Sequence, residues 1–364
     1  MGRRDAVEAE RGACAGRRLY GRNCRGALPP GQVLVNNTQS RSLRPGLASQ
    51  VCKNITLAGV GSLTLVDDTP CAEAPPGCFL VPHDTAPDAR CAHPLACFSP
   101  SMAACIFCLI VLPCACRVAD ACAATLSEMN PFVKVSALHV GQAAIDAARL
   151  KGSFDIVVAS GLPFPALLRL NDECRAAGVN LFATTVWESH GFFFADLGDS
   201  HLVLPPPKKI APDEKPGDAP PPQQGPPKTL AYVPISAAIA APLETLPKNL
   251  NGTYMLLRAA YSVEQATTTR LRPGDTKAFC LAGAALSACA AACTASVLTS
   301  SSLEAFVAGC TMEMPAISAV VGGVLANDML KTISGVGEPA HNFFFFDSHS
   351  MAGTLDRIAC PAAQ

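Results

Sequence analysis

The sequence has few charged side chains and no excess of either sign. Charged residues make up 16% of the 364 positions, and 28 basic residues almost balance 29 acidic ones, which leaves a formal net charge of -1. A chain so balanced lacks the positive field that attracts nucleic acids or anionic membranes. We therefore expect neither of these as a partner.

The sequence also lacks the short motifs of several common enzyme classes. It contains no GxSxG, HExxH, P-loop or GxGxxG motif. After a first expected strand at residues 32–35, residues 36–49 read as a polar loop with a single glycine, Gly46. Phosphate-binding turns need several glycines so that backbone N–H groups can approach the phosphates. This loop argues against a free-standing nicotinamide oxidoreductase, which is the alternative from a different class.

An apolar leader is absent too, because the chain begins MGRRDAVEAERG. Its 18 cysteines are scattered along a long chain, which indicates a reducing compartment rather than a disulfide framework. Cys105, Cys108, Cys114 and Cys116 approach the spacing of zinc ligands, but they lie in an apolar run without histidine, and the second pair is too close. We therefore expect no metal site.

Residues 51–68 combine the two structural periods around which the rest of the chain is organised. Apolar residues at helical spacing are followed by two glycines and a short apolar strand at residues 63–66. The stretch ends in Asp67 and Asp68. A carboxylate at the end of the second strand of a nucleotide-binding βαβ unit can bind a ribose. Asp67 and Asp68 are therefore candidate cofactor ligands, with a solvated strand end as the alternative.

The alternation of strands and helices continues along the chain and predicts an α/β fold with a mainly parallel sheet. Further strands are expected at 132–138, 155–159, 181–186, 229–233 and 342–347, with antiparallel additions at 192–196 and 201–204. Helices are expected at 119–129, 143–150, 167–177, 252–262 and 313–335. The Ala-rich segment 278–303 is expected to form helices packed on the sheet, and the strand at 342–347 to close the chain.

Composition divides the chain into four parts. Residues 1–19 are expected to be disordered, residues 20–204 to form a Rossmann-like half, and residues 229–364 to complete the same fold. Residues 205–228 are a Pro-rich linker that we interpret as a spacer, although its PxxP-like runs are also typical of ligands for SH3 or WW modules.

The chain contains six runs in a characteristic order: CKNITLAGVGSLTLVDD, CFLVPHD, LSEMNPFVKV, SHGFFFADLG, MPAISAVVGGVLANDMLKTISG and NFFFFD. Together they closely resemble the small, Aos-type subunit of heterodimeric SUMO-activating enzymes, which belong to the ThiF/MoeB-like superfamily. The last two runs are the most specific, because the Rossmann-like half is shared by the whole superfamily.

The resemblance implies a pseudo-adenylation domain that pairs with a catalytic large subunit. That subunit would bind ATP and Mg²⁺, adenylate SUMO and carry the thioester cysteine, so this chain would bind no cofactor itself and would meet SUMO through the complex. Adenylating members keep an Asp-Asn pair after the strand at 155–159. The family spacing places Leu162 and Pro163 there, and neither suits Mg²⁺, which prefers carboxylate oxygen. This weakens the case for ATP at Asp67 and Asp68.

The resemblance also implies a role for one arginine near the N-terminus. The family's small subunit opens with Tyr-Asp-Arg-Gln-Ile-Arg, and its first arginine reaches the ATP phosphates in the partner's site. This chain keeps Tyr20, Arg22 and Arg25 at the same spacing, with Gly21 in place of the aspartate. Arg22 is therefore the candidate trans arginine, since an arginine can stabilise charge that develops on phosphates. A solvated basic turn is the alternative.

Two segments depart from the family pattern. The loop at 36–49 is longer and poorer in glycine, and residues 92–117 insert an apolar, Cys-rich segment. Each is either specific to this lineage or translated intron sequence. The alternative within the superfamily is the small subunit for a Nedd-type modifier, which should be considerably longer. The resemblance implies the nucleus as the compartment, with the cytoplasm as the alternative, and does not specify a SUMO paralogue.

Overall fold

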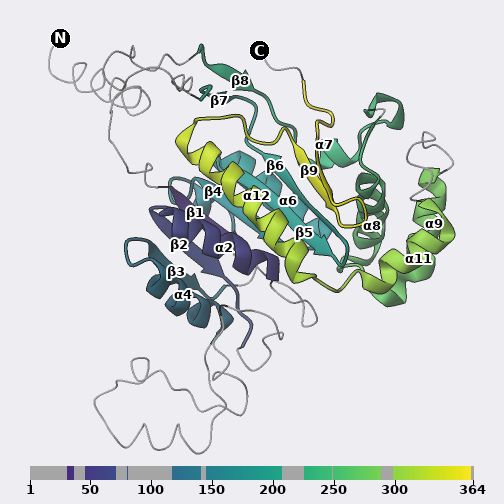
Figure 1. Cartoon of the computed structure of the whole chain (residues 1–364), viewed down its shortest axis with the longest axis horizontal. Helices are drawn as coiled ribbons and strands as arrows, with labels where there is room; N and C mark the ends of the chain where they lie inside the picture. Colours follow the sequence, from purple (N-terminus) through teal and green to yellow (C-terminus); the bar gives the residue numbers. More distant parts are fainter. Residues whose placement is uncertain are drawn as a thin grey trace, which may run out of the picture.

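The computed structural model describes residues 31–36, 46–70, 80, 117–140, 145–206, 225–247, 249–287 and 298–361. Eight strands of this part form one sheet, in the order β10-β9-β6-β5-β4-β1-β2-β3. They are β1 (Gln32–Asn36), β2 (Ser62–Val66), β3 (Lys134–Leu138), β4 (Ile156–Ser160), β5 (Asn180–Trp187), β6 (His190–Asp196), β9 (Phe343–Asp347) and β10 (Ala352–Asp356). Figure 1 shows this sheet running through the middle of the molecule.

Five of the strands are parallel. β1 pairs with β2 and with β4, β2 pairs with β3, and β4 pairs with β5. The parallel part thus has the doubly wound order 3-2-1-4-5, in which the winding reverses between β1 and β4. β6, β9 and β10 continue the sheet beyond β5 as antiparallel strands. The predicted α/β class, a mainly parallel sheet with antiparallel strands, is confirmed.

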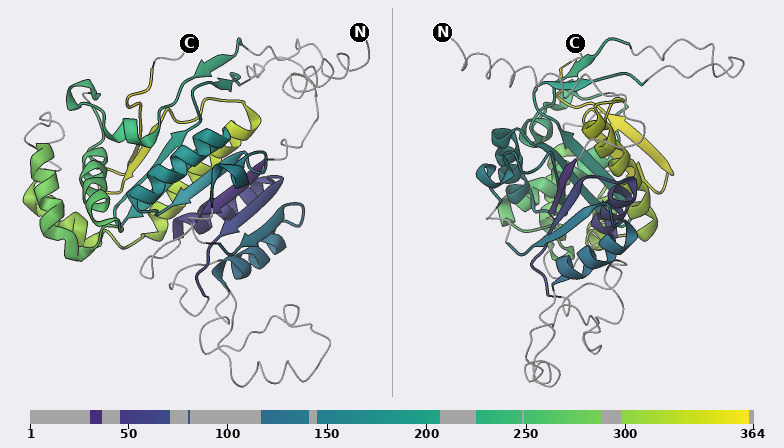
Figure 2. Two further views of the ribbon diagram at one scale, coloured as in Figure 1. Left: turned by 180° about the vertical axis from the view of Figure 1, so that it is seen from behind. Right: turned by 90° about the vertical axis from the view of Figure 1, so that its left-hand side faces the viewer.

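Helices cover both faces of the sheet. One face carries α2 (Gly46–Ala58), α4 (Val118–Met129) and α12 (Pro315–Ser334). The other carries α5 (Ala147–Leu150), α6 (Phe164–Ala177), α7 (Ile235–Ile239) and α8 (Thr253–Thr267), with the short 3-10 helices η4 (Leu243–Thr245) and η5 (Pro273–Asp275) nearby. α2 and α12 lie side by side in Figure 1, and α6 is seen on the opposite face in Figure 2.

The phenylalanines of β9 show how one strand serves both cores. All four are at most 8% exposed. Phe343 and Phe345 belong to the core under α6 and α8, whereas Phe344 and Phe346 belong to the core under α2 and α12. Side chains alternate between the two faces of a strand, so a continuous apolar run is what a sheet covered on both sides requires. The strand predicted from NFFFFD is confirmed.

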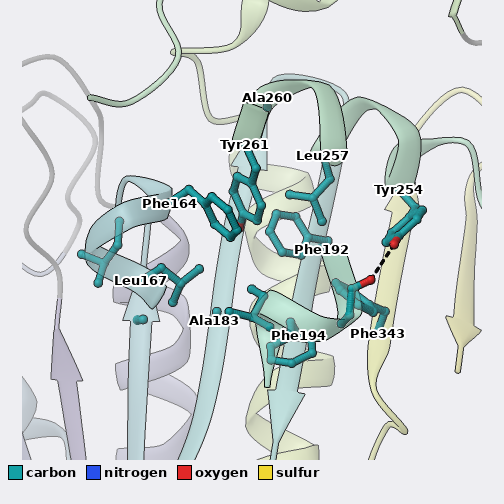
Figure 3. Packing of buried hydrophobic residues seen from close by; sticks show 14 of the residues in the cluster. Phe164, Leu167, Ala183, Phe192, Phe194, Tyr254, Leu257, Ala260, Tyr261 and Phe343 are labelled. Atoms are coloured by element: carbon teal, nitrogen blue, oxygen red, sulfur yellow. Dashed lines mark hydrogen bonds between the residues drawn. The ribbon is translucent and has the colours of Figure 1, made fainter. Parts of the chain in front are cut away.

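Aromatic side chains fix α8 against α6 (Figure 3). The ring of Phe164, at the start of α6, stacks on that of Tyr261 in α8, with centroids 4.2 Å apart and an angle of 11° between the rings. Tyr254, two turns earlier on the same face of α8, donates its hydroxyl to the carbonyl oxygen of Ala238 in α7 at 2.6 Å. These three rings therefore each have a stacking partner or a hydrogen bond, as aromatic side chains in cores prefer.

The long helix α12 has the ends that the sequence predicts. Pro315 occupies its first turn, where the missing N–H costs nothing, and Gly335 takes a left-handed conformation just after its end, with φ 67°. In the part of the chain that the structure describes, α12 is the one helix that is long and apolar enough to cross a membrane, judged by length and composition alone. Half of its apolar stretch is buried within the fold.

Several expectations about boundaries were wrong. α2 begins at Gly46, inside the segment expected to be a loop, because Leu47 and Ala48 are buried in the core. β10 follows β9, so the NFFFFD strand does not close the chain. α9 (Thr276–Ser287) and α11 (Ser300–Gly309), from the Ala-rich segment, pack on each other, α9 also packs on α8, and α11 reaches the sheet through Phe306, which contacts Trp187 of β5. α5 begins at Ala147, later than expected.

The Pro-rich linker leaves and re-enters the fold at one place. β7 (His201–Val203) pairs antiparallel with β8 (Lys228–Leu230), in a separate two-stranded sheet. The strand expected at 201–204 therefore does not extend the main sheet. The linker between Pro206 and Gly225 lies outside the described residues.

Other expectations also fall outside the described part. They are the disordered segment 1–19, the arginine motif at residues 20–25 with Arg22, the four clustered cysteines, and nearly all of the insertion 92–117. The ends of that excursion are described, because Pro70 and Arg117 form an antiparallel bridge. Leu80 is 1% exposed, and its carbonyl oxygen accepts a hydrogen bond from the Thr125 hydroxyl at 2.8 Å. At Leu80 the segment between β2 and α4 therefore contacts α4.

Candidate functional site: the crevice at the ends of β1 and β4

Doubly wound folds bind ligands at the carboxyl ends of the strands where the winding reverses. Here that point lies between β1 and β4. Helix α2 follows β1 and helix α6 follows β4, so both helices begin at this edge. The first N–H groups of a helix have no partner within the helix and favour anions. The groups that occupy these two helix starts therefore decide what the crevice can bind.

The start of α2 is occupied by a carboxylate of the chain itself. Oε2 of Glu313 accepts the backbone N–H of Leu47 at 3.0 Å, and Glu313 is only 9% exposed. A Cβ added at Gly46 would lie 3.2 Å from the same oxygen. Glu313 is held there because it forms a parallel bridge with Glu188, just after β5. A negative charge thus stands where a nucleotide-binding member of this fold class would place a phosphate.

The start of α6 is occupied in the same way. Oε2 of Glu264 accepts the N–H of Phe164 at 2.9 Å, and Oε1 accepts the N–H of Leu271 at 3.1 Å. Glu264 is fully buried, and the guanidinium of Arg270, itself 5% exposed, lies 3.5 Å from Oε1. Burial raises the pKa of the Glu264 carboxyl, and the charge of Arg270 opposes that rise. Both helix starts beside the crevice therefore carry a buried carboxylate from a distant part of the chain.

The end of β4 offers no metal ligand. Leu162 is buried in the core, and Pro163 directly precedes α6. The carbonyl oxygen of Leu162 accepts a long hydrogen bond, 3.5 Å, from Arg270. In the part of the chain that the structure describes, no group of three or more His, Cys, Asp or Glu side chains could hold a metal ion. The described end of β4 therefore supplies no side-chain oxygen for Mg²⁺.

The two predicted ribose ligands lie at the end of β2, as expected from the sequence. Asp67 is 6% exposed, and its Oδ1 accepts the N–H of Thr69 at 2.9 Å. The carbonyl oxygen of Asp68 accepts a hydrogen bond from the guanidinium of Arg117, and Val118 donates its N–H to Thr69 at 2.9 Å. The contacts of Asp68 and Thr69 connect the end of β2 to the start of α4. The Asp67 carboxylate has a structural role there, because it accepts the N–H of Thr69. These contacts do not test whether either residue binds a ribose.

A small apolar hollow adjoins Asp67. It is lined by Val35, Ala48, Ser49, Cys52, Leu65, Val66, Asp67, Leu80, Val118, Ala119 and Cys122. One carboxylate and otherwise mainly apolar walls suit an uncharged ring or aliphatic group better than a phosphate. Leu80, which belongs to the segment between β2 and α4, supplies one of these walls.

Two of the buried thiols, those of Cys174 and Cys310, are poorly suited to act as nucleophiles at neutral pH. Burial raises the pKa of Cys174 to about 12 and that of Cys310 to about 11, and the thiolate is the reactive form. His190 has its Nδ1 3.0 Å from the hydroxyl oxygen of Ser189. Burial lowers its pKa and so disfavours the charged imidazolium form. These geometries indicate structural roles.

Sequence reasoning missed Glu313, Glu264 and Arg270. Glu313 lies 266 positions from the residue whose N–H it accepts, and Glu264 lies 100 positions from Phe164. No local pattern signals a contact over such distances. Leu162 and Pro163, in contrast, lie at the end of β4, where the family spacing places them.

Comparison with known proteins places the fold in a family. The chain matches the ThiF family over residues 117–364. SUMO-activating enzyme subunit 1A of Arabidopsis thaliana is 26% identical over 350 residues, with 94% of this chain and 93% of that protein covered. SUMO-activating enzyme subunit 1 of Xenopus laevis is 25% identical over 358 residues, with 93% and 92% covered. The DNA damage tolerance protein rad31 of Schizosaccharomyces pombe is 22% identical over 343 residues, with 94% of each covered. The similarity spans both the described fold and nearly the full length of these proteins, and the chain belongs to the ThiF family.

Proposed function

We propose that the chain is the small subunit of a SUMO-activating enzyme, which pairs with a catalytic large subunit for the ATP-dependent adenylation and thioester activation of SUMO. The observation that supports this role is the nearly end-to-end similarity to proteins named SUMO-activating enzyme subunit 1. A Nedd-type subunit would leave a large insertion of its own unaligned, whereas 94% and 93% of this chain align with these two proteins. We further propose that the complex acts in the nucleus, which imaging of a tagged chain tests.

We also propose that the chain is non-catalytic, and the two carboxylates at the crevice support this. A nucleotide phosphate at the start of α2 would approach Glu313, and one at the start of α6 would approach Glu264. Two like unit charges 4 Å apart repel by about 4 kcal/mol at an effective dielectric constant of 20. This repulsion applies at Glu313, whereas at the start of α6 the charge of Arg270 offsets that of Glu264, and the Glu264 carboxylate instead occupies the N–H group that a phosphate would use. Leu162 and Pro163 add no side-chain oxygen that could hold a magnesium ion and so offset this repulsion.

SUMO-dependent exchange of pyrophosphate into ATP tests both proposals. The assay is run on the purified chain, on the purified large subunit and on the heterodimer. We expect exchange by the heterodimer and none by the chain alone. Exchange by the rigorously purified chain would contradict the non-catalytic assignment. Replacing SUMO by a Nedd-type modifier in the same assay distinguishes the two modifiers.

The thioester supplies a second test. We expect that no single Cys→Ala change in this chain abolishes formation of the SUMO thioester by the complex, because the reacting cysteine belongs to the large subunit in this proposal. A SUMO adduct on this chain that is removed by a thiol reductant would refute it.

A further inference from the structure

Helices α2 and α12 run in the same direction where they pack together. A Cβ at Gly46, the first residue of α2, would lie 3.5 Å from the Oγ of Ser318 in α12. Four residues further along both helices, a Cβ at Gly322 would lie 2.9 Å from the Cβ of Gln50. Figure 1 shows the two helices side by side on one face of the sheet. Their amino-terminal ends therefore lie next to each other, at the edge of the crevice.

Two adjacent helix starts favour an anion at this place. The first N–H groups of a helix have no partner within the helix, and the aligned peptide dipoles give that end partial positive charge. α12 begins at Pro315, which has no N–H to donate. α12 therefore contributes mainly its partial charge, and the hydrogen-bond donors have to come from α2 and from side chains.

One suitable side chain is present and has no partner. Ser318 is fully buried, and among the described residues its Oγ has no hydrogen-bond partner. Buried hydroxyl groups normally have a partner, because leaving one unpaired destabilises the fold. This Oγ lies beside Gly46, the residue at the start of α2. An unpaired hydroxyl next to a helix start indicates a place for a ligand with acceptor oxygens.

The Glu313 carboxylate partly fills this place. Its Oε2 accepts the N–H of Leu47 at 3.0 Å and would lie 3.2 Å from a Cβ on Gly46. Gly46 therefore leaves the room that the carboxylate oxygen occupies. The carboxylate pairs with the backbone donor of α2 and not with the Ser318 hydroxyl. Glu313 thus acts as an internal anion that uses one of these two donors.

The Glu313 side chain can leave without a movement of the backbone around it. Its backbone is held by a parallel bridge with Glu188 and by the hydrogen bond from the Glu188 N–H to the carbonyl oxygen of Met312, at 2.6 Å. The flanking residues Met312 and Met314 are 51% and 43% exposed, so this segment lies at the surface. Rotation of the side chain about its own bonds can therefore move the carboxylate from the start of α2 into solvent.

We propose that the starts of α2 and α12 form a binding site for a phosphate-like oxyanion, and that Glu313 is a built-in plug that keeps this site closed. A tetrahedral oxyanion has enough oxygens to accept both the Leu47 N–H and the Ser318 hydroxyl, whereas the Glu313 carboxylate accepts only the first of these two donors. Binding requires the carboxylate to leave, because two negative charges at one helix start repel each other. The inference goes beyond the proposed function and does not depend on it, since it concerns anion binding by this chain alone.

Removal of the plug should open the site. Glu313→Ala should bind inorganic phosphate at least about tenfold more tightly than the wild type, because it removes a like charge from contact distance. Adding Ser318→Ala to this variant should weaken binding about three- to tenfold through loss of a donor. Ser318→Ala alone should not lower the unfolding temperature, since its hydroxyl has no partner in the described fold. Glu188→Gln is the charge-matched control and should bind as weakly as the wild type, because the Glu188 carboxylate faces Gly309 of α11.

Binding is measured on the purified full chain by isothermal titration and by the shift in unfolding temperature, with chloride keeping the ionic strength constant. A parallel titration with AMP distinguishes the two sources of such an oxyanion, because tighter binding of AMP than of phosphate would assign the site to a nucleotide. If Glu313→Ala does not fold, Glu313→Gln takes its place. It keeps an acceptor for the Leu47 N–H without the charge and should still bind phosphate more tightly than the wild type.

Two results would overturn the inference. One is equal phosphate binding by the wild type and the Glu313 variants, or binding by none of them. The other is binding by Glu313→Ala that Ser318→Ala leaves unchanged, since the anion would then lie elsewhere. Neither result bears on SUMO-dependent exchange by the heterodimer, which tests the proposed function separately.

Discussion

Removal of the Glu264 carboxylate should be among the most destabilising single changes in this chain. Glu264 is fully buried, accepts two backbone N–H groups and neutralises Arg270. Glu264→Ala leaves the guanidinium buried without its counter-charge, and it leaves the N–H groups of Phe164 and Leu271 without an acceptor. Breaking a buried ion pair from one side costs about 3–5 kcal/mol. We expect a loss in the free energy of unfolding within this range.

The partner change should cost less and should depend on pH. In Arg270→Met the carboxylate keeps both backbone donors, but it loses the positive charge that opposes the rise in its pKa. The folded-state pKa of Glu264 should therefore rise further above its unfolded value of about 4.3. A carboxyl with a raised pKa in the folded state stabilises the fold less as the pH rises through that pKa. The deficit of Arg270→Met relative to the wild type should thus be larger at pH 8 than at pH 5.

Denaturant unfolding measures both effects, provided that the slope of the transition is unchanged. The double variant Glu264→Ala with Arg270→Met completes the cycle, and the coupling between the two positions should be about 1.5–3 kcal/mol. A loss below about 1 kcal/mol for Glu264→Ala would mean that the carboxylate is not needed at the start of α6. A pH-independent deficit for Arg270→Met would refute the electrostatic part of the reasoning.

Further predictions concern the other carboxylate, a second ion pair, a thiol and the N-terminal arginine. Glu313→Ala should lower the free energy of unfolding by about 1–2 kcal/mol through loss of the contact at the start of α2, and an unchanged denaturation midpoint would contradict that contact. Arg175→Ala should cost about 2–4 kcal/mol, since two guanidinium nitrogens bind the buried Asp196 carboxylate at 2.8 and 2.9 Å, whereas the same change with Asp196→Asn already present should cost measurably less. Cys174, with its pKa raised to about 12, should resist iodoacetamide at pH 8 in the native chain, as peptide mass spectrometry would show, and modification at the rate of the unfolded chain would be inconsistent with its burial. Arg22→Ala in the intact heterodimer should slow adenylation about 10- to 100-fold, and equal rates would reduce the motif around Arg22 to a solvated turn.

The elements that were predictable are those whose signals are local. α6 ends at Gly178, which adopts a left-handed conformation with φ 70°, and the glycine is visible in the sequence. The apolar run of β9 follows from burial on both faces of the sheet. β10 was not predicted because its sequence contains no apolar run and few of its side chains are buried. Ala352 and Gly353 are exposed, and Leu355 is 67% exposed. An edge strand with one solvated side carries no apolar run.

The candidate site was predictable only at the strand ends. The family spacing places Leu162 and Pro163 after β4, and the acidic pair Asp67 and Asp68 marks the end of β2 in the sequence itself. The buried carboxylates at the crevice were not predictable, because each reaches a helix start on another part of the chain. α2 illustrates the consequence. Its start at Gly46 depends on Glu313, which is contributed by a segment near the other end of the sequence.

The pairing of β9 with β6 makes the two halves of the sequence complementary fragments. Five residue pairs, from His190 with Asp347 to Phe194 with Phe343, join the strands, and α12 from the second half covers α2 from the first. Cleavage of the chain between Pro206 and Gly225 should therefore leave the two fragments bound to each other. Expressed separately, the first fragment would expose the free edge of β6, and the second would hold β9 without a neighbour on that side. Each fragment should be insoluble when expressed alone and soluble when the two are expressed together. The Pro-rich segment is therefore a suitable place to divide the protein into two fragments whose solubility reports their association.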